Sequence, residues 1–244
     1  MLSKNKIKYI QSLGQKKHRE EEGLFIAEGP KILEELLIPG FLQIREVLAL
    51  PSWASTHQKQ LGHIPCTILE DFELEKISQL ATPNQVLALV EIPVADTIPA
   101  ISDQVILALD DIRDPGNLGT IVRIADWFGI NAVVCSRDTT DIYNPKTVQS
   151  AMGSIGRVRL FYTTLADWLF SQTDTPVYAA VLEGEDVTTM KKVSRGIILI
   201  GNESKGISPE ILEMVTDKIT IPARGKAESL NAAVATGIIL SHLV

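Results

Sequence analysis

The carboxyl-terminal half of this 244-residue chain alternates apolar runs of strand length with segments of helix length. Continuous runs of Val, Ile and Leu are typical of strands that are buried on both faces of a parallel sheet. The predicted strands are 105–109, 132–135, 158–161, 177–181, 197–200 and 219–221. The predicted helices are 118–128, 145–151, 164–170, 209–215 and 229–243. The pattern therefore predicts an α/β fold with a parallel sheet that is covered by helices on both faces.

A similar but shorter alternation precedes it and predicts a small α/β domain. Its strands are expected at 24–27, 46–50, 66–69 and 85–90, and its helices at 30–37, 54–60 and 70–79. Residues 91–100 contain two prolines and no helical period, and proline removes a backbone donor and disfavours helix at the residue before it. We therefore predict a domain at 1–92, a linker at 93–103 and a second domain at 104–244.

Composition places the chain among ordinary globular proteins, with 45% hydrophobic and 22% charged residues. No stretch reaches the roughly 18 apolar residues that a membrane-spanning helix needs, and the first residues lack the apolar core of a signal peptide. We therefore expect a cytoplasmic protein without a membrane segment. Cys66 and Cys135 are far apart and the four histidines are scattered, so the sequence indicates neither a disulfide framework nor a metal site.

The net charge of −7 argues against nucleic acid when taken alone, because phosphate binding depends on Lys and Arg. The distribution of charge is less one-sided, since residues 1–19 contain basic side chains and no acidic one. Glu20, Glu21 and Glu22 follow at once. From charge alone this local patch fits the solvated face of a helix better than it fits an RNA-binding surface.

Three polar phrases, the first two of which contain glycine, interrupt the second domain, and each follows a predicted strand. They lie at 110–123, 201–208 and 228–231. Ligands of parallel sheets bind beyond the carboxyl ends of the strands, so the three phrases are expected to form one site. None contains the GxGxxG or GxxxxGK[ST] pattern, so the sequence gives no positive support for a dinucleotide or a nucleoside triphosphate.

The same phrases resemble the SpoU family of RNA ribose 2'-O-methyltransferases, within the SPOUT superfamily. Residues 117–123 match the first motif, NxGxxxR, whereas 198–207 and 219–235 resemble the second and third motifs. Residues 149–158 are similar to the segment that links the first two motifs. Residues 13–29 resemble the start of the family's substrate-binding domain, which is similar to small α/β ribosomal proteins that bind kinked RNA.

The resemblance implies transfer of a methyl group from S-adenosylmethionine to a ribose 2'-hydroxyl of structured RNA. It also implies a deep trefoil knot in the second domain and a homodimer, whose interface we expect on helices 118–128 and 229–243. Ribosomal RNA is the expected substrate because the first domain resembles that of members that modify rRNA. The alternatives are a tRNA ribose methyltransferase, a base methyltransferase of the wider superfamily, and a non-catalytic RNA-binding protein that retains the fold.

The resemblance assigns catalytic roles to five residues: Arg123, Asn117, Glu203, Ser229 and Asn231. Arginine is a poor general base because its pKa exceeds about 12. We therefore interpret Arg123 as a group that binds phosphate and orients the ribose hydroxyl, although an ion pair with Asp126 or Asp110 is the structural alternative. Glu203 is expected to organise its loop and to hold Arg123. Asn117 and Ser229 would also serve as helix caps.

Seven residues are expected at the cofactor: Leu199, Ile200, Gly201, Asn202, Ile221, Ala223 and Leu230. A glycine after a buried strand lets main chain approach a ligand closely, and apolar Ile221 and Leu230 could flank an adenine. Taken without the motifs, both apolar residues are better explained as core. Because an acidic protein must concentrate its positive charge to bind RNA, we expect an RNA surface built from Lys4, Lys6, Lys16, Lys17, Arg19, Arg113 and Arg157.

Overall fold

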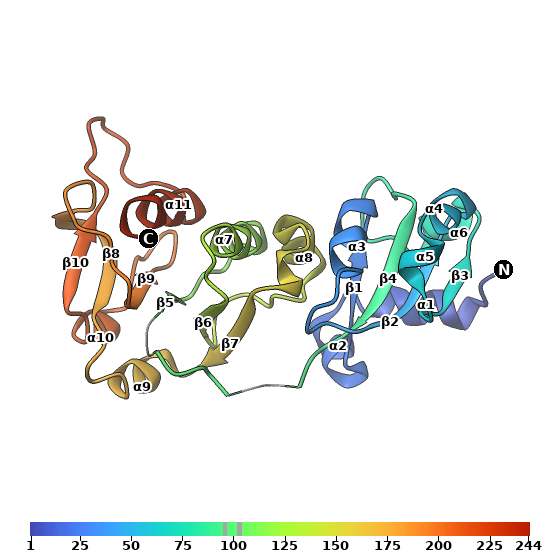
Figure 1. The fold of residues 1–244 in the computed structure, drawn as a ribbon, viewed down its shortest axis with the longest axis horizontal. Coiled ribbons are helices and arrows are strands. Elements are labelled where there is room, and N and C mark those ends of the chain that lie inside the picture. Colours follow the sequence, from blue (N-terminus) through green and yellow to red (C-terminus); the bar gives the residue numbers. More distant parts are fainter. Residues whose placement is uncertain (95–96, 102–103) are drawn as a thin grey trace. The chain divides into compact units, whose positions relative to one another are not determined.

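The structure is a computed structural model that describes residues 1–94, 97–101 and 104–244 (Figure 1). It divides into two compact units. Unit 1 contains Met1–Val94 and Asp141–Arg157, and unit 2 contains Ala95–Thr140 and Val158–Val244. The predicted linker at 93–103 falls partly on residues 95, 96, 102 and 103, which lie outside the described residues.

Unit 1 is built on a four-stranded mixed sheet with the strand order β1-β4-β2-β3. β4 is antiparallel to both β1 and β2, and β2 is parallel to β3. The strands are β1 (Leu24–Glu28), β2 (Ile44–Ala49), β3 (Cys66–Ile68) and β4 (Val86–Glu91). Each lies within two residues of its predicted position.

The helices of unit 1 include two that the apolar pattern did not define, α1 and α2. The set is α1 (Lys4–Ser12), α2 (Lys16–Glu22), α3 (Pro30–Leu36), α4 (Pro51–Thr56), α5 (Gln58–Leu61), α6 (Asp71–Ile77), α8 (Pro145–Ala151) and the short 3-10 helix η1 (Ser154–Gly156). The predicted helix at 54–60 is wrong in its bounds. Two short helices replace it, and the first begins at Pro51, where a missing N–H is not needed.

One face of the unit 1 sheet packs against the helices α1 and α6 and forms a core there. Alternate residues of β1 point into it, together with side chains from β2 and β4. The buried cluster is Ile10, Leu13, Leu24, Ile26, Leu48, Leu69, Leu74, Ile77, Leu87 and Leu89. A capping box between Glu70 and Glu73 closes the first turn of α6 and so fixes the start of that helix.

The segment 141–157 comes from the second half of the sequence but belongs to unit 1. The guanidinium of Arg19 is only 2% exposed and donates to Asp141 Oδ2 through Nη2 at 2.6 Å and through Nε at 3.2 Å. It also donates to the carbonyl oxygens of Leu13 and Gly14 at 3.0 and 2.9 Å. These hydrogen bonds use the donors of the guanidinium within unit 1. The placement does not fit the prediction that Arg19 contacts RNA.

Unit 2 contains a six-stranded sheet in the order β10-β8-β9-β5-β6-β7, and every neighbouring pair is parallel. This confirms the parallel sheet predicted from the apolar runs. The strands are β5 (Val105–Leu109), β6 (Ala132–Ser136), β7 (Arg159–Thr163), β8 (Val177–Asp186), β9 (Gly196–Ile200) and β10 (Asp217–Thr220). β8 is longer than predicted and pairs with β10 across a register shift between Lys218 and Ile219.

The helices of unit 2 cover both faces of its sheet. α7 and α11 pack against each other on one side, and α9 and α10 on the other (Figure 1). Their bounds are α7 (Pro115–Trp127), α9 (Leu165–Phe170), α10 (Pro209–Leu212) and α11 (Ala232–Leu243). Within the described ranges, no helix has the length and apolar character that crossing a membrane requires.

The predicted starts of α7 and α11 are both wrong, and the cause is the choice of cap. Asp114, and not Asn117, caps α7, because its carboxylate accepts from the Asn117 N–H at 2.8 Å. Asn231, and not Ser229, caps α11, because its Oδ1 accepts from the N–H groups of Ala233 and Val234 at 2.9 and 3.3 Å.

Glu28, at the carboxyl end of β1, generates a prediction about pH. Its side chain is 2% exposed and accepts from the Ser78 hydroxyl and from the Gln79 N–H. Burial raises the pKa of this carboxyl above its usual 4.5, and the two hydrogen bonds only partly offset that effect. When the pKa of a carboxyl is higher in the folded protein than in the unfolded chain, the protonated carboxyl stabilises the fold. This contribution is complete at a pH below the pKa of the unfolded chain and is lost as pH rises through the pKa of the folded protein.

We therefore expect the unfolding free energy of Glu28→Gln to be no higher than that of the parent at about pH 4. Relative to the parent, it should increase as pH rises towards about 8. Glutamine has nearly the same shape and keeps an acceptor for Gln79, so the variant isolates the charge. Urea unfolding of both proteins across that range would measure the difference. A difference in unfolding free energy that is independent of pH would contradict the argument.

Candidate functional site

The three polar phrases leave the carboxyl ends of β5, β9 and β10. From β5 the chain continues to β6 and β7 on one side of the sheet, whereas β9 and β8 lie on the other side of β5. The strand order therefore reverses between β5 and β9. In open parallel sheets a reversal of this kind leaves a crevice beyond the carboxyl ends of the two strands, which is the usual place for a ligand.

The side chain of Asn117 joins all three phrases. Its Nδ2 donates to Glu203 Oε1 at 2.8 Å, across 86 residues of sequence. Its Oδ1 accepts from Asn231 Nδ2 at 2.8 Å, across 114 residues. Asn117 lies in the first turn of α7, Glu203 follows β9, and Asn231 caps α11. Three of the five predicted catalytic residues are thus brought together.

Asn202 fixes the loop that carries Glu203. Its Oδ1 accepts from the N–H groups of Ser204 and Lys205, and its main chain exchanges two hydrogen bonds of 2.9 Å with Gly206. Its Nδ2 donates to the carbonyl oxygen of Asp111 at 2.7 Å. The loop after β9 is therefore closed on itself and tied to the loop after β5.

Gly201 is required by the packing of this same loop. A Cβ atom at this position would lie 2.4 Å from the carbonyl carbon of Gly206 and from the nitrogen of Ile207, closer than any side chain tolerates. The close approach expected of Gly201 is thus made by the chain's own main chain. Leu199 and Ile200, also predicted at the cofactor, are buried in β9. Leu199 is paired with strands on both sides, and the Ile200 carbonyl oxygen accepts from the Asp110 N–H at 2.9 Å.

Arg123 is exposed on α7 and has no hydrogen bond or ion pair with any residue that the structure describes. The alternative ion pair with Asp126 or Asp110 is therefore not formed, and neither is the implied contact with Glu203. Asp110 is instead 6% exposed, and its Oδ2 accepts from the Ser208 N–H at 2.7 Å. A guanidinium left with its five donors unused is suited to binding an anion.

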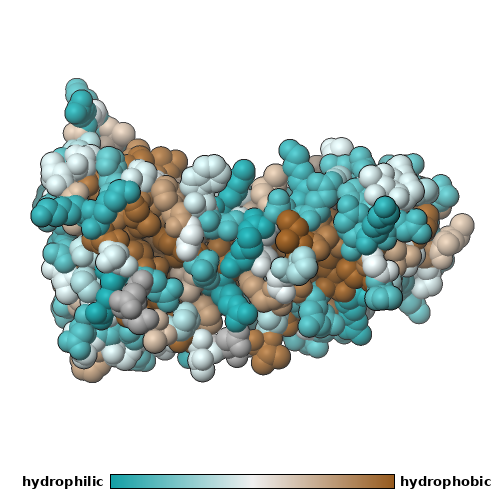
Figure 2. All heavy atoms as spheres, viewed as in Figure 1, coloured by the Kyte–Doolittle hydropathy of each residue, from teal (hydrophilic) through white to brown (hydrophobic). Residues whose placement is uncertain are grey.

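The connection from β10 to α11 extends away from the sheet in Figure 1. Ile221 is half-buried, whereas Ala223 and Ser229 are exposed. Leu230 is 48% exposed. Figure 2 shows apolar surface over the α11 side of unit 2, where Val234 is also half exposed. Apolar side chains left open beside a polar network are the surroundings that a bound aromatic base prefers.

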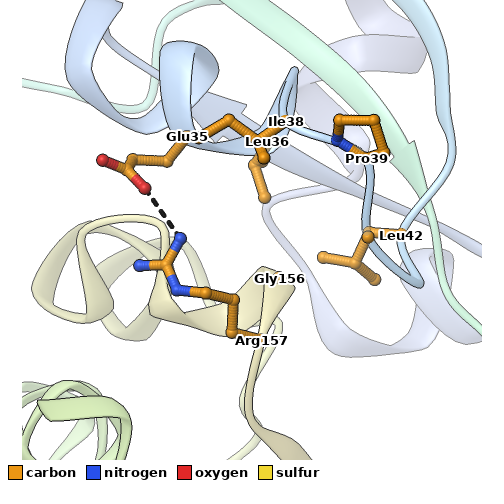
Figure 3. Close-up of a pocket in the computed structure, with 8 residues that line it drawn as sticks. Glu35, Leu36, Ile38, Pro39, Leu42, Gly156 and Arg157 are labelled. Atoms are coloured by element: carbon orange, nitrogen blue, oxygen red, sulfur yellow. Dashed lines mark hydrogen bonds and ion pairs between the residues drawn. The ribbon is translucent and has the colours of Figure 1, made fainter.

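Unit 1 has a recess of its own between α3, the loop that follows it, and η1 (Figure 3). Its walls are mainly apolar, and Arg157 Nη1 donates to Glu35 Oε2 at 2.7 Å at its edge. The lining residues are Glu35, Leu36, Ile38, Pro39, Gly40, Leu42, Gly156 and Arg157. Arg157, predicted to bind RNA, is thus already paired with a carboxylate.

The amino-terminal lysines differ in how freely they present their charge. Lys6 Nζ lies 2.6 Å from Glu46 Oε2 and is the most enclosed of them. Lys16 and Lys17 make only loose, exposed pairs with Glu20 and Glu21, at 3.7 and 3.8 Å. Exposed pairs of this kind contribute little energy, so both lysines are available to a stronger anion. Lys4 is also exposed.

Sequence reasoning missed Asp111 and the hydrogen bond that it forms with Asn202. Asp111 has a positive φ of 56° and receives the Asn202 side chain, so the two residues together join the first two phrases. A polar residue directly after a buried strand was the available signal. Among the described residues, no group of three or more His, Cys, Asp or Glu side chains is arranged to hold a metal ion.

The fold and the three joined loops define a parallel-sheet protein with one site at the carboxyl edge of unit 2, preceded by a separate α/β unit. Residues 104–241 match the SpoU rRNA Methylase family, and residues 4–88 match the MRM3-like substrate binding domain. The chain belongs to the SpoU rRNA methylase family. This confirms the resemblance that the three motifs indicated.

Relatives of the same length support the assignment. The chain is 31% identical over 242 residues to the 23S rRNA (guanosine(2553)-2'-O)-methyltransferase RlmP of Bacillus subtilis, covering 98% of this chain and 95% of the relative. The structure of AviRb from Streptomyces viridochromogenes, a SpoU methyltransferase in complex with AdoMet, matches with a TM-score of 0.86 and 26% identity, over 98% and 97% of the two chains. An AdoMet-bound rRNA methyltransferase from Sinorhizobium meliloti also gives 0.86, at 29% identity over 99% and 95%.

The double role of Asn117 generates a prediction. Asn117→Asp replaces a donor by a second carboxylate beside Glu203, so at neutral pH the variant should lose about 1–3 kcal/mol of unfolding free energy. Part of the loss should return near pH 5, where one of the two carboxyls takes up a proton. Urea unfolding at both pH values would measure this.

Asn231→Asp is the matched control. It keeps the cap of α11, because Asp caps helices as well as Asn does, and it removes only the donor to Asn117. Its loss should be smaller and should depend less on pH. Equal losses at both pH values in Asn117→Asp would show that the contact with Glu203 does not hold the loops together.

Proposed function

We propose that this protein transfers a methyl group from S-adenosylmethionine to a ribose 2'-hydroxyl of RNA, and of ribosomal RNA in particular. The observation that carries the proposal is the junction of Asn117, Glu203 and Asn231, which joins the three motif loops into one site. RlmP and the Sinorhizobium meliloti enzyme are both named as acting on rRNA, and the match of residues 4–88 to a substrate-binding domain supports the same class of substrate.

A ribose methyltransferase acting on tRNA is the second candidate. Another relative, from Synechocystis, carries a name that covers both tRNA and rRNA, and it is 26% identical over 96% of this chain. A non-catalytic RNA-binding role is the weaker alternative, because Arg123, Asn117 and Glu203 are all present and Arg123 is kept free of internal partners.

The residues present fit S-adenosylmethionine. Leu230 and Ile221 offer apolar contact for an adenine, and the main chain around Gly201 and Ala223 would meet its polar edges. When bound, this cofactor supplies an electrophilic methyl group on a sulfonium. The protein must then position the ribose hydroxyl, favour loss of its proton and exclude water.

Arg123 is the group we assign to the hydroxyl. A guanidinium beside that oxygen stabilises the negative charge that develops as the proton leaves, and it binds the neighbouring phosphate at the same time. The acceptor we assign to the proton is an oxygen of that phosphate. Asn117 and Glu203 act as positioning residues, because their hydrogen bond keeps the start of α7 against the loop after β9. Ser229, exposed before the cap of α11, is placed to contact the ribose or the cofactor.

RNA binding is assigned to residues 1–92, the predicted first domain, together with cations of the catalytic domain at 104–244. The exposed Lys4, Lys16 and Lys17 are its best candidates in unit 1. Lys6 and Arg157 would have to exchange a carboxylate partner for a phosphate, and Arg19 is too buried to contribute. Arg113 is the candidate in unit 2.

A homodimer and a location in the cytoplasm, where ribosomal RNA is found, complete the proposal. Trp127, at the end of α7, is 85% exposed, and Val234, in the first turn of α11, is 50% exposed. Large exposed apolar side chains on adjacent helices favour burial against a second copy. The trefoil knot implied by the family stays a prediction.

The experiment is methylation of unmethylated rRNA transcripts with labelled S-adenosylmethionine, followed by mass spectrometry of the nucleosides. We expect 2'-O-methylated nucleosides from the parent protein. Arg123→Ala should lower kcat by about 10²–10³, the usual cost of removing one preorganised donor, while calorimetric affinity for the cofactor stays within about twofold. Arg123→Lys is the control and should retain more activity than Arg123→Ala, since lysine keeps the positive charge but lacks the paired N–H donors of a guanidinium.

A methylated base would contradict the ribose assignment. Failure of the parent protein to bind S-adenosylmethionine at all would contradict the enzymatic proposal and favour the non-catalytic one. Methylation of tRNA but not of rRNA would select the second candidate.

A further inference from the structure

Asp111 is the second residue after β5 and has a φ of 56°, in the left-handed region that residues other than Gly, Asn and Asp rarely adopt. Its main chain is held on both sides. The N–H donates to Ser136 Oγ at 2.9 Å, and the carbonyl oxygen accepts from Asn202 Nδ2 at 2.7 Å. These two bonds fix the turn from β5 towards α7, and a longer contact of 3.3 Å from Asn202 Nδ2 to Asp111 Oδ2 adds to them.

The shorter contact of the Asp111 carboxylate is with Arg113. Its Oδ1 accepts from Arg113 Nε at 2.8 Å, two residues along the chain. The Arg113 side chain is 64% exposed, and among the described residues its terminal nitrogens have no hydrogen-bond partner. An arginine that is held by Nε presents its two terminal nitrogens as a fixed edge, which matches two oxygens of a phosphate.

The position of this pair relates it to the candidate site. Asn202, which bonds to Asp111, precedes Glu203, and Glu203 bonds to Asn117. Hydrogen bonds and one peptide link therefore run without interruption from the Arg113 guanidinium to the residues assigned to methyl transfer. A phosphate on Arg113 would be held at a fixed place relative to them.

We propose that Arg113 binds a backbone phosphate of the RNA substrate and that Asp111 is the positioning residue that orients it. The inference rests on the proposed function and names the residues by which unit 2 holds its substrate. If Asp111 orients Arg113, removing its carboxylate should weaken RNA binding, whereas charge repulsion alone predicts the opposite. A carboxylate near a phosphate repels it, so its removal would strengthen RNA binding if its charge were all that mattered.

The variant Asp111→Gly distinguishes a positioning role of Asp111 from simple charge repulsion of the phosphate. Glycine adopts a positive φ freely. Both main-chain bonds remain, and on the Asn202 side only the longer 3.3 Å contact to Oδ2 is lost, so the variant should keep its fold, with a melting temperature within about 4 °C of the parent. Asp138→Asn is the matched control. Asp138 is a second acidic residue whose charge acts on Arg113, but no hydrogen bond joins the two within the described structure.

The measurement is filter binding of a bacterial 23S rRNA transcript across a series of salt concentrations, with methylation rates on the same RNA. We expect Asp111→Gly to bind about tenfold more weakly and to raise KM for RNA with little change in kcat, because the oriented edge is lost. Asp138→Asn should bind as well as the parent or slightly better. Arg113→Ala should lower the salt slope by about one phosphate contact.

In the Arg113→Ala background, Asp111→Gly should have no further effect on affinity, since the residue it positions is gone. Unchanged or tighter RNA binding by Asp111→Gly in the presence of Arg113 would overturn the inference. So would an additive loss in the double variant. If instead the parent protein binds the RNA but transfers no methyl group, the proposed function fails while the phosphate contact can still be measured.

Discussion

The amide of Asn117 is the interaction on which the candidate site depends. It donates to Glu203 with one end and accepts from Asn231 with the other, and so ties together loops that are 86 and 114 residues apart in sequence. A carboxylate in its place could not donate, and an apolar side chain could do neither. The residue type is therefore set by the need to satisfy an acceptor and a donor at once.

The partners of Asn117 are themselves held by local structure. Asn231 uses Oδ1 to cap α11 and Nδ2 to reach Asn117, so the start of that helix and the closure of the site are fixed by one side chain. Glu203 stands on a turn that Asn202 and Gly206 close and that Gly201 allows to pack tightly. Arg123 and Leu230 remain exposed around this network, available to a phosphate and to an aromatic base.

Much of the fold followed from sequence, because continuous apolar runs of strand length that alternate with helices are typical of a parallel sheet covered on both faces. The helix starts did not follow. Several capping residues compete within a few positions. Asp114 caps α7 while the Asn117 side chain bonds to the other two loops, whereas Asn231 caps α11 and also bonds to Asn117. The burial of Arg19 was also beyond reach, since its partner Asp141 lies 122 residues away and belongs by sequence to the other half of the chain. The site residues came from motif resemblance, and periodicity alone would have assigned Ile221 and Leu230 to the core.

The central claim, that three distant loops form one binding site, is tested most directly by amide hydrogen exchange with and without S-adenosylmethionine. We expect protection to rise together at the start of α7, in the loop after β9, and between β10 and the first turn of α11, while α2 exchanges as before. Protection confined to one of these loops, in a protein shown by calorimetry to bind the cofactor, would contradict it.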